Sequence, residues 1–121
     1  MRDDVRDAFL GSERGDEPGT FRATYRFDPE LPVFTGHFPG DPLLPAVFEI
    51  EMVRHATEVF SLFSYRIAEV KKAKISARIN PGELIAVDGR ATEAEGGVRV
   101  TATLSVDSQV RANITLVLKP A

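Results

Sequence analysis

The sequence predicts an α+β domain in which a curved antiparallel sheet wraps around one long helix. Apolar residues recur at helical spacing over several turns from Val47 to about Leu62. From Arg66 almost to the C-terminus, apolar and polar residues alternate with period two, which is typical of successive antiparallel strands with one dry face. Because that face has to be covered and one long apolar helix is available, we expect the sheet to wrap around the helix.

Length and composition indicate a single domain spanning residues 1–121. A hydrophobic content of 43% in 121 residues supports one small core, so we expect a partner subunit to add to it. The 15 Lys and Arg residues against 18 Asp and Glu residues give a net charge of -3, which argues against nucleic acid as a partner. The chain has no cysteine and no apolar run long enough to span a bilayer. Its charged N-terminus is unlike a signal peptide, so we expect a cytoplasmic protein without membrane attachment.

The first third of the chain alternates predicted regular and irregular segments. Residues 1–10 suit a short amphipathic helix, and the glycines of residues 11–19 predict irregular structure. Residues 20–27 alternate as a half-buried strand, with Phe21, Ala23, Tyr25 and Phe27 on its dry face.

A rigid loop precedes the predicted helix and surrounds His37. Three prolines fix φ along it, namely Pro39, Pro42 and Pro45, and two glycines, Gly36 and Gly40, allow tight turns beside them. Pro45 suits the first helical position, where the missing N–H is no loss. We therefore expect this loop to hold His37 in a fixed place just before the helix.

Four strands are predicted after the helix. The first covers residues 66–79 and ends at an Asn80-Pro-Gly82 turn, and the second covers residues 83–94. A hairpin at residues 95–97 leads to strands at 98–106 and 110–118. The residues of the first strand expected to face inward are Ile67, Ala73, Ile75, Ala77 and Ile79. One helix wrapped by such a sheet is the hot-dog architecture.

The stretch from Gly36 to Val47, Gly-His-Phe-Pro-Gly-Asp-Pro-Leu-Leu-Pro-Ala-Val, resembles the active-site motif of the 3-hydroxyacyl-[acyl-carrier-protein] dehydratases of fatty-acid synthesis. That family pattern is His-Phe-Pro-Gly-x-Pro-x-x-Pro-Gly-Val with an acidic residue fourteen positions after the histidine, and here 51 minus 37 is 14. Residues 73–82 are similar to the family's strand that leads into a Pro-Gly turn.

The resemblance implies a role for each matching position. His37 matches the base that removes the C2 proton of the thioester. Glu51 matches the acid that assists departure of the C3 hydroxyl as water, and in this family it comes from the neighbouring protomer. Ala46 stands where the family usually has a glycine whose N–H binds the thioester carbonyl. The loop residues Phe38 and Pro39, together with Gly40, match the segment that shapes the acyl tunnel.

The residues also fit this chemistry on physical grounds. Histidine is a base near neutral pH, and a carboxyl on an apolar helix favours its protonated form, which a proton donor needs. Backbone N–H groups at the helix N-terminus, around Ala46 and Val47, would stabilise negative charge on the thioester oxygen. We expect no metal and no organic cofactor.

Three side chains leave alternatives open. The methyl group of Ala46 puts the geometry around the thioester oxygen in doubt. His55 replaces a common family glutamine, and either His55 or Arg54 has the helical spacing to pair with Glu51 and weaken it as a proton donor. Glu49 is a substitute acid, but two helical residues are separated by about 200°, so Glu49 and Glu51 cannot face the same site.

The expected activity is dehydration of a 3-hydroxyacyl thioester to a trans-2-enoyl thioester, with an acyl carrier protein as partner. A hot-dog thioesterase and a non-catalytic acyl-binding subunit are the alternatives, because fold alone does not fix function. A basic set could dock the acidic carrier, although exposed cations on an outer strand are also ordinary: Arg66, Lys71, Lys72, Lys74 and Arg78. The resemblance implies a homodimer or a hexamer of three dimers.

Overall fold

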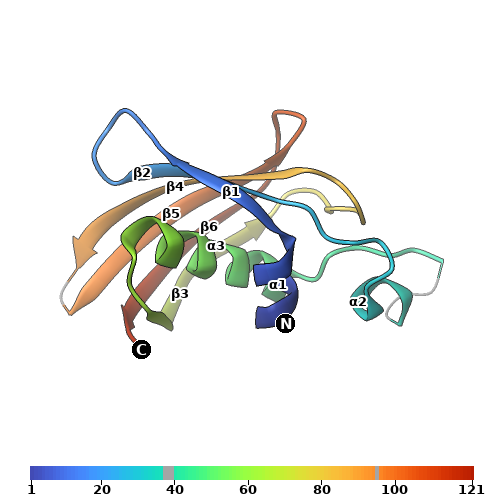
Figure 1. Ribbon diagram of the computed structural model, residues 1–121, viewed down its shortest axis with the longest axis horizontal. Helices are drawn as coiled ribbons and strands as arrows, with labels where there is room; N and C mark the ends of the chain where they lie inside the picture. The colour runs from blue at the N-terminus through green and yellow to red at the C-terminus, as the bar shows by residue number, and fades with distance from the viewer. Residues whose placement is uncertain (37–39, 95) are drawn as a thin grey trace.

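The computed structural model describes residues 1–36, 40–94 and 96–121 and confirms the predicted α+β class. Figure 1 shows the longest helix lying against the concave face of a curved sheet. In chain order the elements are α1 (Arg2–Ala8), β1 (Phe9–Arg14), β2 (Thr20–Tyr25), α2 (Pro32–Thr35), α3 (Ala46–Ser61), β3 (Tyr65–Ile75), β4 (Ile85–Ala94), β5 (Gly97–Val106) and β6 (Gln109–Pro120).

The sheet has six strands in the order β1-β2-β4-β5-β6-β3, and every neighbouring pair is antiparallel. Strand β3 follows α3 in the chain but lies at the far edge, where it pairs with β6. The predicted turn at residues 80–82 is present, with Gly82 at a φ of 78°. Ala94 pairs with Gly97 across the predicted hairpin, of which residue 95 lies outside the described residues.

Helix α3 forms where the sequence predicts it, with a small difference at its start. Pro45 has an extended ψ of 149° and caps the helix, which begins at Ala46 and not at Pro45. Because Leu62 adopts a left-handed φ of 54°, the helix ends there. The side chains of Met52, Val53 and Ala56 are fully buried against the sheet.

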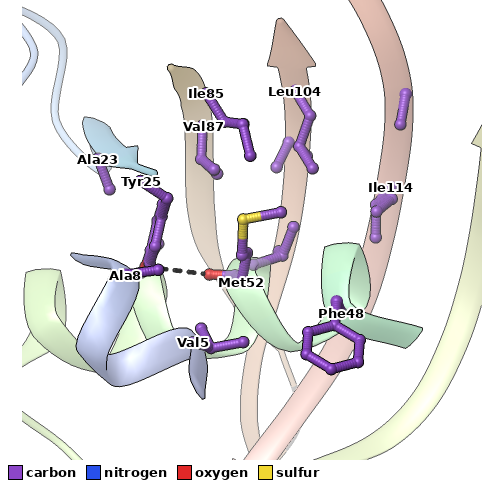
Figure 2. Close-up of a cluster of buried hydrophobic side chains, with 14 of the residues drawn as sticks. Val5, Ala8, Ala23, Tyr25, Phe48, Met52, Ile85, Val87, Leu104 and Ile114 are labelled. Carbon is purple, nitrogen blue, oxygen red and sulfur yellow. Dashed lines mark hydrogen bonds between the residues drawn. The ribbon is translucent and has the colours of Figure 1, made fainter. Parts of the chain in front are cut away.

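The core lies between α3 and the inner face of the sheet. Figure 2 shows Met52 pointing from α3 toward the strands that carry Val87 and Leu104. The alternation predicted for three strands is confirmed over most of their length, because these inward residues are buried: Phe21, Ala23 and Tyr25 of β2, Val100, Ala102, Leu104 and Val106 of β5, and Ala112, Ile114, Leu116 and Leu118 of β6. The same alternation placed Val98 and Val110 on the dry face, but Val98 is only half-buried and Val110 is 48% exposed.

Two strand predictions were wrong. Residues 9–14, expected to end a helix and begin an irregular segment, form strand β1, which pairs with β2 through a register shift between Phe9 and Gly11. In and just after β3, Ala73, Ile75 and Ala77 are exposed, although alternation predicted that they face inward. The reason is positional: β3 is an edge strand with two register irregularities, and α3 does not cover its far half.

The apolar helical pattern, whose spacing runs from Val47 to Phe63, has an exposed residue at each end. Val47 is 55% exposed at the start of α3, and Phe63 is 52% exposed beyond its end. Among the helices that the structure describes, none is long and apolar enough to cross a membrane.

Candidate active site at the start of helix α3

Part of the predicted site lies outside the described residues. His37, Phe38 and Pro39 belong to this part, so their predicted roles stay predictions. Gly40, Ala46, Val47 and Glu51 are described, and they lie in the loop before α3 and in its first two turns.

The loop before α3 is held to the segment that follows β3. Asp41 forms a bidentate ion pair with Arg78, in which Nη2 of Arg78 lies 3.1 Å from Oδ2. The Leu44 N–H donates to the carbonyl of Ile79 at 2.9 Å. Gly40 has a φ of 86°, a conformation that favours glycine. The hydrogen bond and charge of Arg78 lower the pKa of Asp41, so this anchor is ionic at neutral pH.

The helix N-terminus presents its backbone toward solvent. Ala46 and Val47 are exposed and occupy the first two positions of α3, where N–H groups have no acceptor within the helix. Ala46 has helical backbone geometry, so an alanine in place of the family's glycine causes no backbone strain here. These N–H groups and the positive end of the helix dipole suit an anionic or polarised oxygen.

Glu51 is buried in an ion-pair cluster. Arg54 donates from Nε to Oε1 at 2.7 Å and from Nη2 to Oε2 at 2.5 Å, so both carboxylate oxygens of Glu51 accept a hydrogen bond. Arg2 of α1 lies 3.9 Å from Oε1. Glu51 and Arg54 are 3% and 4% exposed, so water screens this pair little.

His55 forms a different contact from the one considered for it. Its Nδ1 lies 2.7 Å from the hydroxyl of Tyr25, and its ring lies against Phe9 at 5.3 Å between centroids. Burial is the main cause that lowers the pKa of His55, so the neutral ring is favoured. Arg54, and not His55, is therefore the partner of Glu51.

Glu49 is the polar group that the sequence analysis undervalued. It is 1% exposed, and its Oε1 has no hydrogen-bond partner in the part of the chain that the structure describes. Burial raises the pKa of Glu49 to about 7. The signal was present in the sequence, because Glu49 precedes the buried Met52, Val53 and Ala56 by three, four and seven residues, which places it on the same helix face.

Across residues 1–36, 40–94 and 96–121, no three His, Cys, Asp or Glu side chains gather closely enough to hold a metal ion.

Sequence comparison decides the family. Residues 13–113 match the family described as ApeI-like, ApeI dehydratase. The chain belongs to this dehydratase family. The 3-hydroxyacyl-[acyl-carrier-protein] dehydratase FabZ of Pasteurella multocida is 30% identical over 101 residues, covering 74% of this chain and 66% of that protein. FabZ of Yersinia enterocolitica is 29% identical over 119 residues, covering 87% and 71%. The resemblance found in the sequence is confirmed, although the chain spans only 66% of the first relative's length.

Solved structures place this member of the ApeI-like family in the hot-dog fold, as predicted. The dehydratase heterocomplex ApeI:P from Xenorhabdus doucetiae contains a chain that is 22% identical with a TM-score of 0.77, covering 92% of this chain and 96% of that one. The protein smu.793 from Streptococcus mutans, solved bound to acetyl CoA, is 13% identical with a TM-score of 0.67, covering 93% and 86%. At these identities the likeness shows the fold alone.

Proposed function

We propose that this chain converts 3-hydroxyacyl thioesters, carried by an acyl carrier protein, into trans-2-enoyl thioesters in fatty-acid or related acyl synthesis. His37 acts as the base on C2, and Glu51 is the acidic residue that assists departure of the C3 hydroxyl. Backbone N–H groups at Ala46 and Val47 stabilise the negative charge that develops on the thioester oxygen. Phe38, Pro39 and Gly40 shape the entrance for the acyl chain.

One observation carries the proposal: the dehydratase family match spans residues 13–113 and includes a histidine and a glutamate separated by 14 positions. The described geometry supports it further, because Ala46 begins a helix whose first N–H groups have no intrahelical acceptor. A cytoplasmic location stays a prediction from the sequence.

The carrier protein would dock on the basic side of β3. Arg66, Lys72 and Lys74 are exposed on this strand, and Lys71 is close to Glu69, with 3.0 Å between Nζ and Oε2. Acidic carrier surfaces are attracted to such clustered cations, mainly through a faster encounter.

The same edge supports the proposed homodimer, or hexamer of three dimers. Val70 and Ile75 are 44% and 41% exposed on a strand that pairs with β6 alone among the described strands. An unpaired edge with apolar side chains is a template for pairing with another chain. The ApeI:P neighbour is a heterocomplex, so a related partner chain is the alternative to a second copy.

Hydration of trans-2-enoyl thioesters tests the reaction in reverse. We expect loss of the conjugated absorbance with wild-type protein, and a decrease in kcat/KM of at least about 100-fold for His37→Ala and for Glu51→Gln. The chain has two histidines, so His55→Gln is the matched control, and we expect it to retain activity within about tenfold.

Each alternative gives its own result. Release of free thiol with the absorbance unchanged would indicate a thioesterase, and acyl binding without turnover of short and long carrier-linked substrates would indicate a binding subunit. Equal activity of His37→Ala and His55→Gln would contradict the proposed base.

A further inference from the structure

Arg54 is the only buried lysine or arginine among the residues that the structure describes. Besides its two hydrogen bonds to Glu51, its Nη1 lies 2.6 Å from Oε2 of Glu58 and donates to the carbonyl of Tyr65 at 3.2 Å. Glu58 is in turn fixed by the N–H of Tyr65, which donates to the same Oε2 at 2.6 Å. The guanidinium is therefore held from the side opposite Glu51, by the next helical turn and by the start of β3.

This arrangement determines both the direction and the charge of the Glu51 carboxyl group. A guanidinium that donates two parallel hydrogen bonds fixes the plane of the carboxylate. An ionised carboxylate has about four acceptor positions, so the two that Arg54 occupies leave others for a ligand. The charged or titratable groups around Glu51 and Arg54 lie on three elements: His55 and Glu58 on α3, Arg2 on α1, and Tyr25 on β2.

Only arginines supply positive charge among these groups. Burial, followed by the charge of Glu51, raises the pKa of Tyr25, so its phenol stays neutral, and the lowered pKa of His55 favours its neutral ring. Arg2 is 3.9 Å away and its side chain is 63% exposed. Arg54 is therefore the main counter-charge of Glu51.

A purely structural role explains this cluster poorly. Buried ion pairs contribute little to stability compared with well-packed apolar residues, because desolvation offsets the Coulomb attraction. A site that needs a carboxylate in one exact orientation gives a reason for keeping the pair.

We propose that Arg54 is a positioning residue that keeps Glu51 ionised and fixed in orientation, so that Glu51 accepts a hydrogen bond from the 3-hydroxyl of the substrate. This inference rests on the proposed dehydration. In that reaction the proton that leaves C2 for His37 is then the one that reaches the departing hydroxyl, so a 3-hydroxyacyl thioester gives a 2-enoyl thioester and water. Glu51 orients the leaving group and is not its proton donor.

The first measurement follows the charge of Glu51 and does not depend on catalytic activity. With ¹³C-labelled glutamate side chains and Glu51→Gln to assign the signal, the Glu51 carboxyl carbon is followed by NMR across neutral pH. We expect a carboxylate signal throughout in wild type and in Arg54→Lys. In Arg54→Met the signal should move with pH, because a buried carboxylate without its counter-charge favours the protonated form. A wild-type Glu51 signal that titrates near neutral pH would overturn the proposal.

The second measurement separates positioning from folding. Lysine keeps the charge of Arg54 but not its planar fork, so kcat of Arg54→Lys should fall about 10- to 100-fold while the pH dependence of kcat/KM stays that of wild type. The control is Arg22→Lys, because Arg22 on β2 forms a similar but exposed bidentate pair with Asp88 on β4. Equal kcat for the two lysine variants would refute a positioning role. A folded wild type without turnover would instead refute the dehydratase function, while the NMR result still decides the charge of Glu51.

Discussion

Two glutamates on one helix show how strongly a residue's surroundings decide its chemistry. Glu51 lies between guanidinium groups, whereas Glu49 lies on the sheet-facing side, where its Oε1 has no hydrogen-bond partner among the described residues. The expectation that these side chains face different surroundings follows from helical geometry, and it is confirmed. The pairing of His55 with Tyr25 was not predictable, because it joins residues 30 positions apart through tertiary packing.

The raised pKa of Glu49 predicts a pH-dependent stability. Burial raises the pKa of Glu49 from 4.5, the value for the unfolded chain, to about 7 in the folded protein. Its contribution to the free energy of unfolding is therefore fully present below the unfolded-state pKa and is lost as the pH rises through the folded-state pKa. The corresponding decrease in the free energy of unfolding is about 3 kcal/mol. Urea unfolding at a series of pH values should show this decrease in wild type, and a flatter profile for Glu49→Gln. Glu93→Gln, an exposed control on β4, should keep the wild-type slope, and a Glu49→Gln profile with that same slope would contradict the assignment.

At the scale of elements, the alternating pattern predicted the dry face correctly wherever a helix covers the sheet. Strands β2, β5 and β6 pack on α3 or on neighbours that do, and their alternating residues are buried. The same pattern failed in the far half of β3, because that part of the edge strand has no cover within one subunit. Strand β1 was missed because its glycine and charged residues follow no alternation, and its pairing with β2 defines it.

Gly89 lies where β2 and β4 leave no room for a larger side chain. It pairs with Phe21 across β2 and β4, and a Cβ at position 89 would lie 2.3 Å from Cζ of the Phe21 ring. That ring is 3% exposed and stacks on Phe60 at 4.9 Å, so it has little room to move. Gly89→Val should lower the free energy of unfolding by about 2 kcal/mol or more, measured by urea unfolding. Gly11→Ala on β1 is the control, since nothing lies within 4 Å of its added Cβ, and an equal loss in both variants would argue against the clash.

For the molecule as a whole, the sequence predicted the helix-in-sheet fold and the family, but not the arrangement of charges in the site. The fold follows from periodicity, which is local, whereas the selection of Arg54 over His55 by Glu51 depends on how α1, α3 and β3 meet. His37 stays a prediction from the motif.

The exposed apolar residues of β3 provide a test of the proposed oligomeric state. Replacing Val70 and Ile75 together with lysine should shift the protein from dimer or larger to monomer, because charges on an edge strand oppose pairing. Sedimentation velocity measures this directly. Val110→Lys, at a position 48% exposed on β6, is the control and should leave the assembly unchanged. A wild type that sediments as a monomer would contradict the proposed homodimer.

The ion pair between Asp41 and Arg78 has a consequence for the timing of catalysis. Arg78 belongs to the basic set proposed to receive the carrier protein, and it also anchors the loop that leads into α3. An acidic carrier surface that competes for this guanidinium would release the anchor at the moment of delivery. Delivery of the acyl group and loosening of the loop would then coincide. Small free thioesters carry no acidic protein surface, so the ion pair between Asp41 and Arg78 would stay intact when they bind.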